Sequence, residues 1–129
     1  MKLIINIKPF SFDLTRKLIT SKGIIHKKIG LLLQLKDSYG NCGWGEVSPI
    51  EGNELKDCIE SLNFIGRKTT KDSIENYLCE LPGSLAFGLG SSLADLENLT
   101  IKKLDFEGFN ITGSSYLLPT DIDPLESVV

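Results

Sequence analysis

The chain has 129 residues, of which 41% are hydrophobic and 24% are charged, a balance typical of one globular domain that can bury a core. Its 14 basic and 17 acidic residues give a formal net charge of −3, with lysines spread along the chain, so nucleic-acid binding as the main function lacks an electrostatic basis. Apolar runs such as GLLLQL fall far short of the roughly 20 residues that a membrane span needs, and no cleavable leader pattern opens the sequence. We therefore expect a cytoplasmic protein with no nucleic-acid and no membrane partner.

The first part of the chain predicts β-strands. Residues 2–10 alternate between apolar and polar side chains around Leu3, Ile5 and Ile7. In residues 28–35 the same alternation places four side chains on one side: Ile29, Leu31, Leu33 and Leu35. Between the two, residues 13–28 predict a long connecting loop, in which Gly23 of TSKG allows a turn.

A third strand is expected after the turn residues KDSYGN. The strand NCGWGEV then pairs with GLLLQLK across a tight reversal. Gly43 and Gly45 are expected to let this strand approach neighbouring backbone, while Trp44 packs inward. The first part of the chain is thus predicted to be a three-stranded antiparallel meander.

Three helices are predicted after Pro49. The first helix begins at an Asn53 cap and ends at Gly66. Its apolar residues recur at helical spacing and form a stripe on one side: Leu55, Cys58, Ile59 and Leu62. The second begins at a capping box of Thr69 and Asp72, stops at Pro82 and contains Ile74, Tyr77, Leu78 and Leu81. The third contains Leu85, Leu89, Leu93 and Leu96, interrupted by Gly88 and Gly90, each of which costs on the order of 1 kcal/mol relative to alanine. A face of small residues such as Gly88 and Ser92 suits close backbone packing.

Few residues offer chemistry of their own. His26 is the single histidine, and its surroundings favour a partly exposed strand or loop position. The acidic residues Glu54 and Asp57 open a helix near its positive end, which accounts for them without a metal. The three cysteines lack the close spacing of zinc or redox sites, so reduced, packed thiols are expected.

Three stretches together resemble one family. They are KLITSKGIIHKKIGLLLQLKDSYGNCGWGEVSPIEG, then LPGSLAFGLGSSLADL, and then SSYLLP. In this order they resemble the amino-terminal capping domain of the enolase superfamily, with the closest likeness to the o-succinylbenzoate synthase family. The combination of GWGE and SP with the later LP and SLAFGL is specific at the family level, whereas GWGE alone is not.

The resemblance implies an α+β capping domain over residues 1–113, with a three-stranded antiparallel β-meander followed by a helical subdomain. Residues 114–129 would be the truncated start of a catalytic barrel. In the family that barrel carries a lysine base in a Lys-x-Lys motif, and three of its carboxylates hold Mg²⁺. The adjacent pair Lys102 and Lys103 lacks this motif. The resemblance therefore places no catalytic residue, no metal ligand and no cofactor in this chain, which alone should be inactive.

The implied reaction is a lyase reaction, the dehydration of 2-succinyl-6-hydroxy-2,4-cyclohexadiene-1-carboxylate to 2-succinylbenzoate in menaquinone or phylloquinone biosynthesis. By the same likeness, two capping loops close over the barrel and touch this small carboxylate substrate. Their residues here are Ser21, Lys22 and Gly23, and Ser48, Pro49 and Ile50. The partners implied are thus the substrate and a C-terminal barrel domain. The face around Gly88 and Ser92 should pack on that barrel and, without it, could drive self-association.

Two alternatives stay open. Dipeptide epimerases, muconate cycloisomerases and N-acylamino acid racemases share this architecture, so the reaction could be another one. The chain could also be a stand-alone binding module without catalysis.

Overall fold

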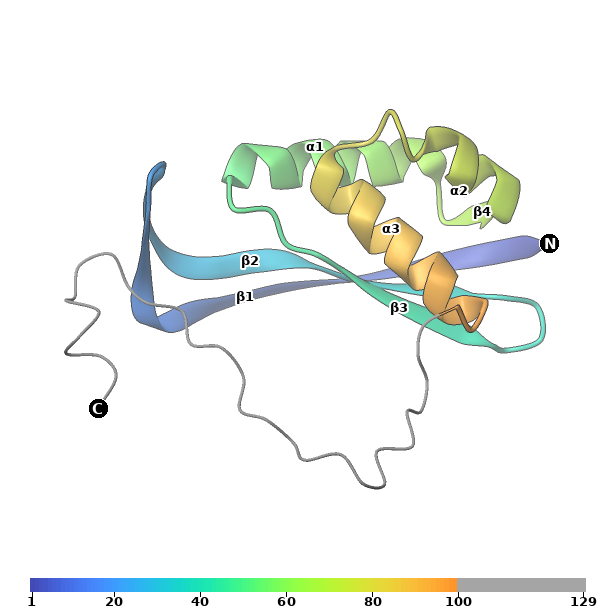
Figure 1. The fold of residues 1–129 in the computed structure, drawn as a ribbon. Helices are drawn as coiled ribbons and strands as arrows, with labels where there is room; N and C mark the ends of the chain where they lie inside the picture. The colour runs from blue at the N-terminus through green and yellow to red at the C-terminus, as the bar shows by residue number, and fades with distance from the viewer. Residues whose placement is uncertain (100–129) are drawn as a thin grey trace, which may run out of the picture.

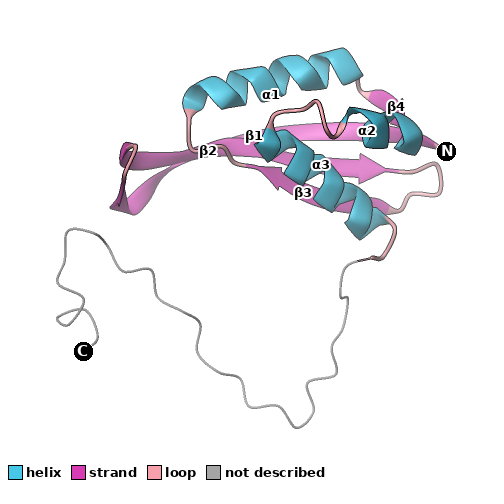
Figure 2. Cartoon of the chain, turned by 45° about the horizontal axis from the view of Figure 1, so that its top comes forward, coloured by secondary structure: helices cyan, strands magenta, loops and turns pink. Residues whose placement is uncertain are grey.

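An antiparallel sheet covered on one face by helices makes up the computed structural model, which describes residues 1–99 (Figures 1 and 2). The elements are β1 (Lys2–Thr20), β2 (Gly23–Lys36), β3 (Cys42–Val47), α1 (Gly52–Ile65), β4 (Lys68–Thr70), α2 (Lys71–Tyr77) and α3 (Gly83–Leu96). The α+β fold expected from the sequence is confirmed. The SSYLLP stretch, the pair Lys102 and Lys103, and the expected barrel start at 114–129 lie outside the described residues.

The predicted meander forms three neighbouring strands of a four-stranded sheet with the order β3-β2-β1-β4. β3 pairs with β2 from Leu31↔Val47 to Lys36↔Cys42, as expected. The fourth strand, β4, was not predicted, because its three residues are too few to show an alternating pattern. It pairs with the start of β1, from Lys2↔Thr70 to Ile4↔Lys68.

The long loop expected over residues 13–28 is wrong. β1 and β2 remain paired as far as Thr20↔Gly23, so this segment is the outer half of one long hairpin. The pairing shifts between Asp13 and Leu18, where β1 carries extra residues. This irregularity breaks the period-2 pattern and hides the strand from sequence reasoning. The turn at TSKG itself is confirmed, with Gly23 at a φ of 136°.

α1 and α3 follow their predicted stripes, except that Ile59 is exposed. The second helix is shorter than predicted: α2 ends at Tyr77 rather than at Pro82, so Leu78 and Leu81 lie beyond it. Two of the N-caps also differ. α1 has Glu51 at its N-cap position, without a side-chain cap, rather than Asn53. α2 is capped by Thr70, whose Oγ1 accepts a 3.2 Å hydrogen bond from the Ser73 N–H. The predicted cap Thr69 is one residue too early, because β4 continues through Thr70. The end of α1 at Gly66 is confirmed by its φ of 82° and its 2.9 Å bond to the Leu62 carbonyl.

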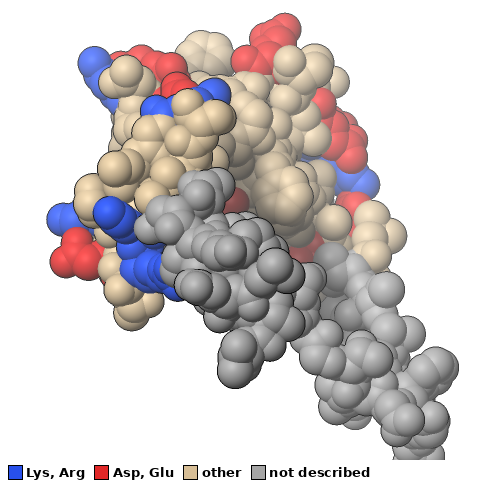
Figure 3. Space-filling model, turned by 60° about the vertical axis from the view of Figure 1, so that its left-hand side comes forward, with Lys and Arg blue, Asp and Glu red and all other residues tan. Residues whose placement is uncertain are grey.

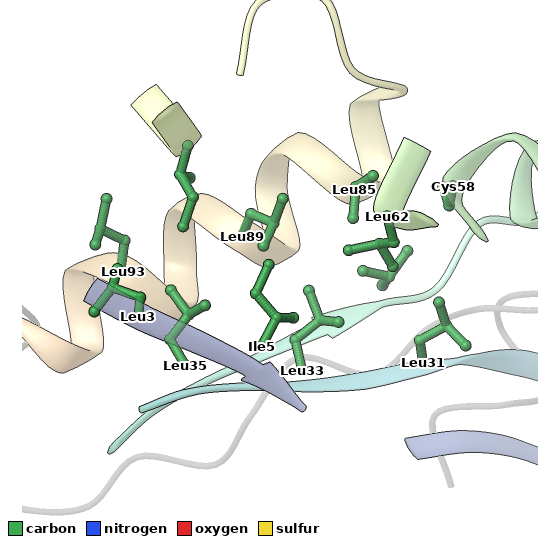
Figure 4. Packing of buried hydrophobic residues seen from close by; sticks show 12 residues of the cluster. Leu3, Ile5, Leu31, Leu33, Leu35, Cys58, Leu62, Leu85, Leu89 and Leu93 are labelled. Atoms are coloured by element: carbon green, nitrogen blue, oxygen red, sulfur yellow. The ribbon is translucent and has the colours of Figure 1, made fainter. Parts of the chain in front are cut away.

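One hydrophobic core joins the sheet to the helices (Figure 4). Its buried side chains come from alternate positions of the strands and from the stripes of the helices: Leu3, Ile5, Leu31, Leu33, Leu35, Val47, Cys58, Leu62, Ile74, Leu85, Leu89 and Leu93. Alternation places every second strand residue on the helix side. The apolar faces of the strands, which alternate every second residue, therefore pack against the apolar stripes of the helices in one core.

The closest approach in this core is between β3 and α3. A Cβ at Gly45 would collide with the Gly88 carbonyl oxygen, and one at Gly43 with backbone atoms of α3. The expected close packing at Gly43, Gly45 and Gly88 is thus confirmed. The small-residue face of α3 was expected to pack on a barrel, whereas in the structure it packs on β3. Because Gly88 and Ser92 are buried against β3, the expectation that their face is exposed is wrong. Self-association stays a prediction, and this face no longer supports it.

The inward packing expected for Trp44 is also wrong, since this residue is 57% exposed. Strand residues alternate between the two faces, and Gly43, Gly45 and Val47 occupy the helix side. Trp44 must therefore point to the opposite face of the sheet.

Basic and acidic side chains occur together on the face drawn in Figure 3, separated by uncharged atoms. Two ion pairs join neighbouring strands, Lys27 with Asp13 at 3.7 Å and Lys28 with Glu46 at 2.8 Å. Within residues 1–99, the helices are too short and too polar for any of them to cross a bilayer.

Candidate functional site

The turn at the end of the β1–β2 hairpin forms one side of the candidate site. Ser21 and Lys22 make the turn itself, and Gly23 begins β2. Thr20 Oγ1 donates a 2.9 Å hydrogen bond to the Gly23 carbonyl and accepts one of 3.3 Å from the Lys22 N–H. Because both bonds hold the backbone on either side of Ser21, the position of Lys22 is defined by local structure.

The loop between β3 and α1, residues 48–51, forms the other side. Ser48 Oγ donates a 3.4 Å hydrogen bond to the Ile29 carbonyl, which ties the start of the loop to β2. Pro49 and Ile50 follow, and Glu51 stands at the N-cap position of α1. The Glu51 carbonyl accepts a 3.1 Å bond from the Glu54 N–H, so the loop runs directly into the first helical turn.

These two segments border a shared pocket of about 540 Å³. Its lining residues are Thr20, Ser21, Lys22, Ser48, Pro49, Ile50, Glu51, Glu54 and Ser84. Five of the six predicted loop residues are therefore brought together, although the two segments lie more than twenty residues apart in the chain. The sixth, Gly23, does not line the pocket and serves the turn instead.

An ion pair crosses the pocket mouth. Lys22 Nζ lies 3.2 Å from Glu51 Oε1, and both side chains are mainly exposed. Glu51 carries no hydrogen bond to its own helix terminus, so its carboxylate is directed across the pocket instead. Sequence reasoning missed this role, because the two residues are 29 positions apart.

The back of the pocket is fixed by a contact between two helices. Glu54 Oε1 accepts hydrogen bonds from the Ser84 hydroxyl at 3.0 Å and from the Ser84 N–H at 3.3 Å. Pro82 stands at the N-cap of α3 and provides no side-chain cap, so Glu54 supplies the acceptor from α1. The sequence showed Glu54 only as an acidic residue at a helix start, and nothing in it marked Ser84.

The pocket is polar and carries both signs of charge, with one ammonium group and two carboxylates. Within residues 1–99, no three side chains of His, Cys, Asp or Glu gather closely enough to hold a metal ion. The Mg²⁺ that the resemblance implies therefore does not fit this part of the chain.

The cysteines are free thiols in different surroundings. Cys58 is buried in the core, whereas Cys79 is exposed and Cys42 is intermediate. Burial raises the pKa of the Cys58 thiol, and the negative charge of Glu54 raises it further. The expectation of packed thiols holds for Cys58 but is wrong for Cys79.

Comparison with known proteins found no matching protein-family model and no matching curated protein. Solved structures do match. The o-succinylbenzoate synthase of Thermosynechococcus elongatus BP-1, complexed with Mg in its active site, is 23% identical with a TM-score of 0.56, over 70% of this chain and 29% of that one. A mandelate racemase/muconate lactonizing protein from Herpetosiphon aurantiacus is 15% identical with a TM-score of 0.57, over 72% of this chain and 29% of that one.

A third match is the dipeptide epimerase of Methylococcus capsulatus, complexed with Mg and the dipeptide L-Arg-D-Lys. It is 22% identical with a TM-score of 0.53, over 77% of this chain and 31% of that one. The chain thus spans less than a third of the length of these structures. What the matches share with it is the fold, an antiparallel sheet covered on one face by helices.

Proposed function

We propose that this chain is the capping domain of an o-succinylbenzoate synthase and acts together with a barrel domain. In this proposal residues 1–113 form the cap and residues 114–129 lead into the barrel. The observation that carries the proposal is the meeting of the hairpin turn and loop 48–51 around one pocket. The quoted sequence motifs and the fold shared with a solved synthase support it.

The cap would bind and enclose the substrate. Lys22 supplies an ammonium group at the pocket mouth, which can pair with a substrate carboxylate. Pro49 and Ile50 supply apolar surface that excludes water when the two loops face a barrel. Proton abstraction and metal binding are assigned to the barrel by the resemblance. In the part of the chain that the structure describes, no three side chains of His, Cys, Asp or Glu gather closely enough to hold a metal ion.

A dipeptide epimerase is the second candidate. Two carboxylates, those of Glu51 and Glu54, line the pocket beside the single ammonium of Lys22. Such a mixture suits a zwitterionic ligand with a free amine as well as a carboxylate. Two dipeptide epimerases also share the fold, with TM-scores of 0.51 and 0.53.

A cap exchange tests both proposals. The cap of the Thermosynechococcus elongatus synthase is replaced by this chain, and a parallel chimera uses the barrel of the Methylococcus capsulatus epimerase. We expect magnesium-dependent dehydration of the synthase substrate by the first chimera and little epimerisation by the second. The reverse ranking would favour the epimerase.

Three controls accompany the exchange. Each barrel without a cap gives the baseline, and each barrel with its own cap gives the full rate. The chain by itself should not dehydrate the substrate with Mg²⁺ present, and turnover by the chain alone would contradict the division of labour proposed here. Activity of neither folded chimera would leave the stand-alone binding module as the better account.

A further inference from the structure

The outer end of the β1–β2 hairpin has one polar link to the rest of the described chain. Residues 18–25 bond to one another across the hairpin, from Leu18↔Ile25 to Thr20↔Gly23. Within residues 1–99, the ion pair of Lys22 with Glu51 is the one side-chain bond that joins this end to another element. This ion pair is therefore the polar contact that helps to hold the hairpin end over the pocket.

The opposite side of the pocket is held far more firmly. Ser48 is tied to β2 through the Ile29 carbonyl, and Glu54 is tied to α3 through two bonds from Ser84. Glu51 lies between these two anchored points, at the start of α1. One wall of the pocket is thus built into the domain, and the other is a two-stranded ribbon, a structure of marginal stability when isolated.

We propose that Lys22 and Glu51 form a latch that holds the hairpin end over the pocket and opens readily to admit a ligand. The pair is suited to this because its side chains are 75% and 61% exposed. Exposed ion pairs are weak, so breaking this one should change the ratio of closed to open hairpin ends by a factor of about two to five. The ligand-gating role rests on the proposed function, whereas the latch itself is a property of this chain.

The latch also makes the pocket sensitive to salt. The charges are in water, where the screening length falls from about 10 Å at 0.1 M to about 3 Å at 1 M ionic strength. High salt should therefore open the hairpin end in the unmodified chain. The bonds of Ser84 with Glu54 do not depend on two opposite charges, so the fixed wall should be affected less.

Charge exchange tests the latch on the 129-residue chain. The variants are Lys22→Glu, Glu51→Lys and the double exchange, and the measurement is the backbone amide order parameter of residues 20–23 by NMR. We expect each single change to lower the order parameters from near the rigid value of about 0.85 toward about 0.6. The double exchange, which restores an ion pair of reversed direction, should recover them.

A matched control is available in the same hairpin. Lys27→Glu breaks the 3.7 Å pair with Asp13, which joins the two strands of the hairpin and reaches no element outside it. It should leave residues 20–23 unchanged. Unchanged order parameters in both single variants, or no recovery in the double exchange, would overturn the latch.

The consequence for a ligand is measured separately in an active cap–barrel protein. The change used here is Glu51→Gln, which breaks the ion pair and keeps Lys22 for the substrate carboxylate. It should raise KM about two- to fivefold, with a smaller change in kcat. If the order parameters of residues 20–23 behave as expected but KM does not change when the ion pair is broken, the latch stands and its role in admitting a ligand is rejected. Absence of synthase activity would reject the proposed function and leave the NMR result standing.

Discussion

Gly45 of β3 lies directly against the carbonyl oxygen of Gly88 in α3, with no room for a Cβ on Gly45. The strand and the helix approach backbone to backbone, and Ser92 Oγ, which donates a 2.7 Å bond to that same carbonyl, fills the neighbouring space. The two glycines on either side of Trp44 are therefore required by α3. This contact holds β3 in place, and β3 leads directly into the pocket loop.

Alanine at Gly45 should consequently destabilise the fold. The added Cβ collides with backbone that cannot move without separating β3 from α3, so we expect a loss of about 2 to 3 kcal/mol or more. Urea denaturation of the purified chain measures it. Gly90→Ala is the matched control, because a Cβ there meets nothing within 4 Å. It should stabilise the chain by up to about 1 kcal/mol through helix propensity, and equal losses in both variants would contradict the packing described.

Trp44 should contribute little to stability. Its side chain is on the face of the sheet away from the helices, so we expect Trp44→Ala to cost less than about 1 kcal/mol. Its fluorescence emission should resemble that of an indole in water, with easy quenching by acrylamide. Leu33→Ala removes a fully buried side chain in the neighbouring strand and should cost about 2 to 5 kcal/mol. A Trp44 variant as unstable as the Leu33 variant would show that the indole is buried.

The thiols should differ in reactivity. The raised pKa and complete burial of Cys58 keep it protonated and inaccessible, whereas Cys79 is exposed. With an alkylating reagent at pH 8, mass spectrometry should show modification of Cys79 in the native chain and of Cys58 only after unfolding. A folded-state pKa above the unfolded one means that the contribution of Cys58 to stability is present at low pH and is lost as the pH rises through the folded pKa. Early modification of Cys58 in the folded chain would contradict its burial.

The turn between β2 and β3 should weaken in acid. The Asp37 carboxylate accepts 2.9 Å bonds from the Asn41 side chain and from the N–H groups of Tyr39 and Asn41. These bonds, the Asn41 side chain first, lower the pKa of Asp37 below its ordinary value of 3.8. The stabilisation is therefore present above about pH 4 and is lost as the pH falls through the folded pKa.

Asn41→Ala tests this account of the turn. Removing the side-chain donor should move the pKa of Asp37 upward, toward its ordinary value, in an NMR titration of its carboxyl carbon. An unchanged Asp37 titration in the variant would show that the Asn41 side chain does not stabilise the carboxylate.

Local patterns in the sequence were sufficient for most of the fold. The stripes of α1 and α3, the end of α1 at Gly66 and the turn before β3 each depend on residues within a few positions of one another. The orientation of Trp44 was also within reach, because strict alternation from Val47 places it on the face opposite the core. The outer half of the hairpin could not be predicted from the sequence, because extra residues of β1 after Asp13 interrupt the alternation of apolar and polar side chains.

The sequence alone determined the α+β class, the alternation of the inner strands and the stripes of α1 and α3, and it indicated the two loops that border the pocket. Only the tertiary structure decided what those loops do together. The pairs Lys22 with Glu51 and Glu54 with Ser84 join residues 29 and 30 positions apart. No local propensity encodes such contacts, because they exist only after the hairpin, β3 and the helices pack around one core. The pocket is therefore a product of packing, although every residue that lines it belongs to a segment whose local form could be predicted or nearly so.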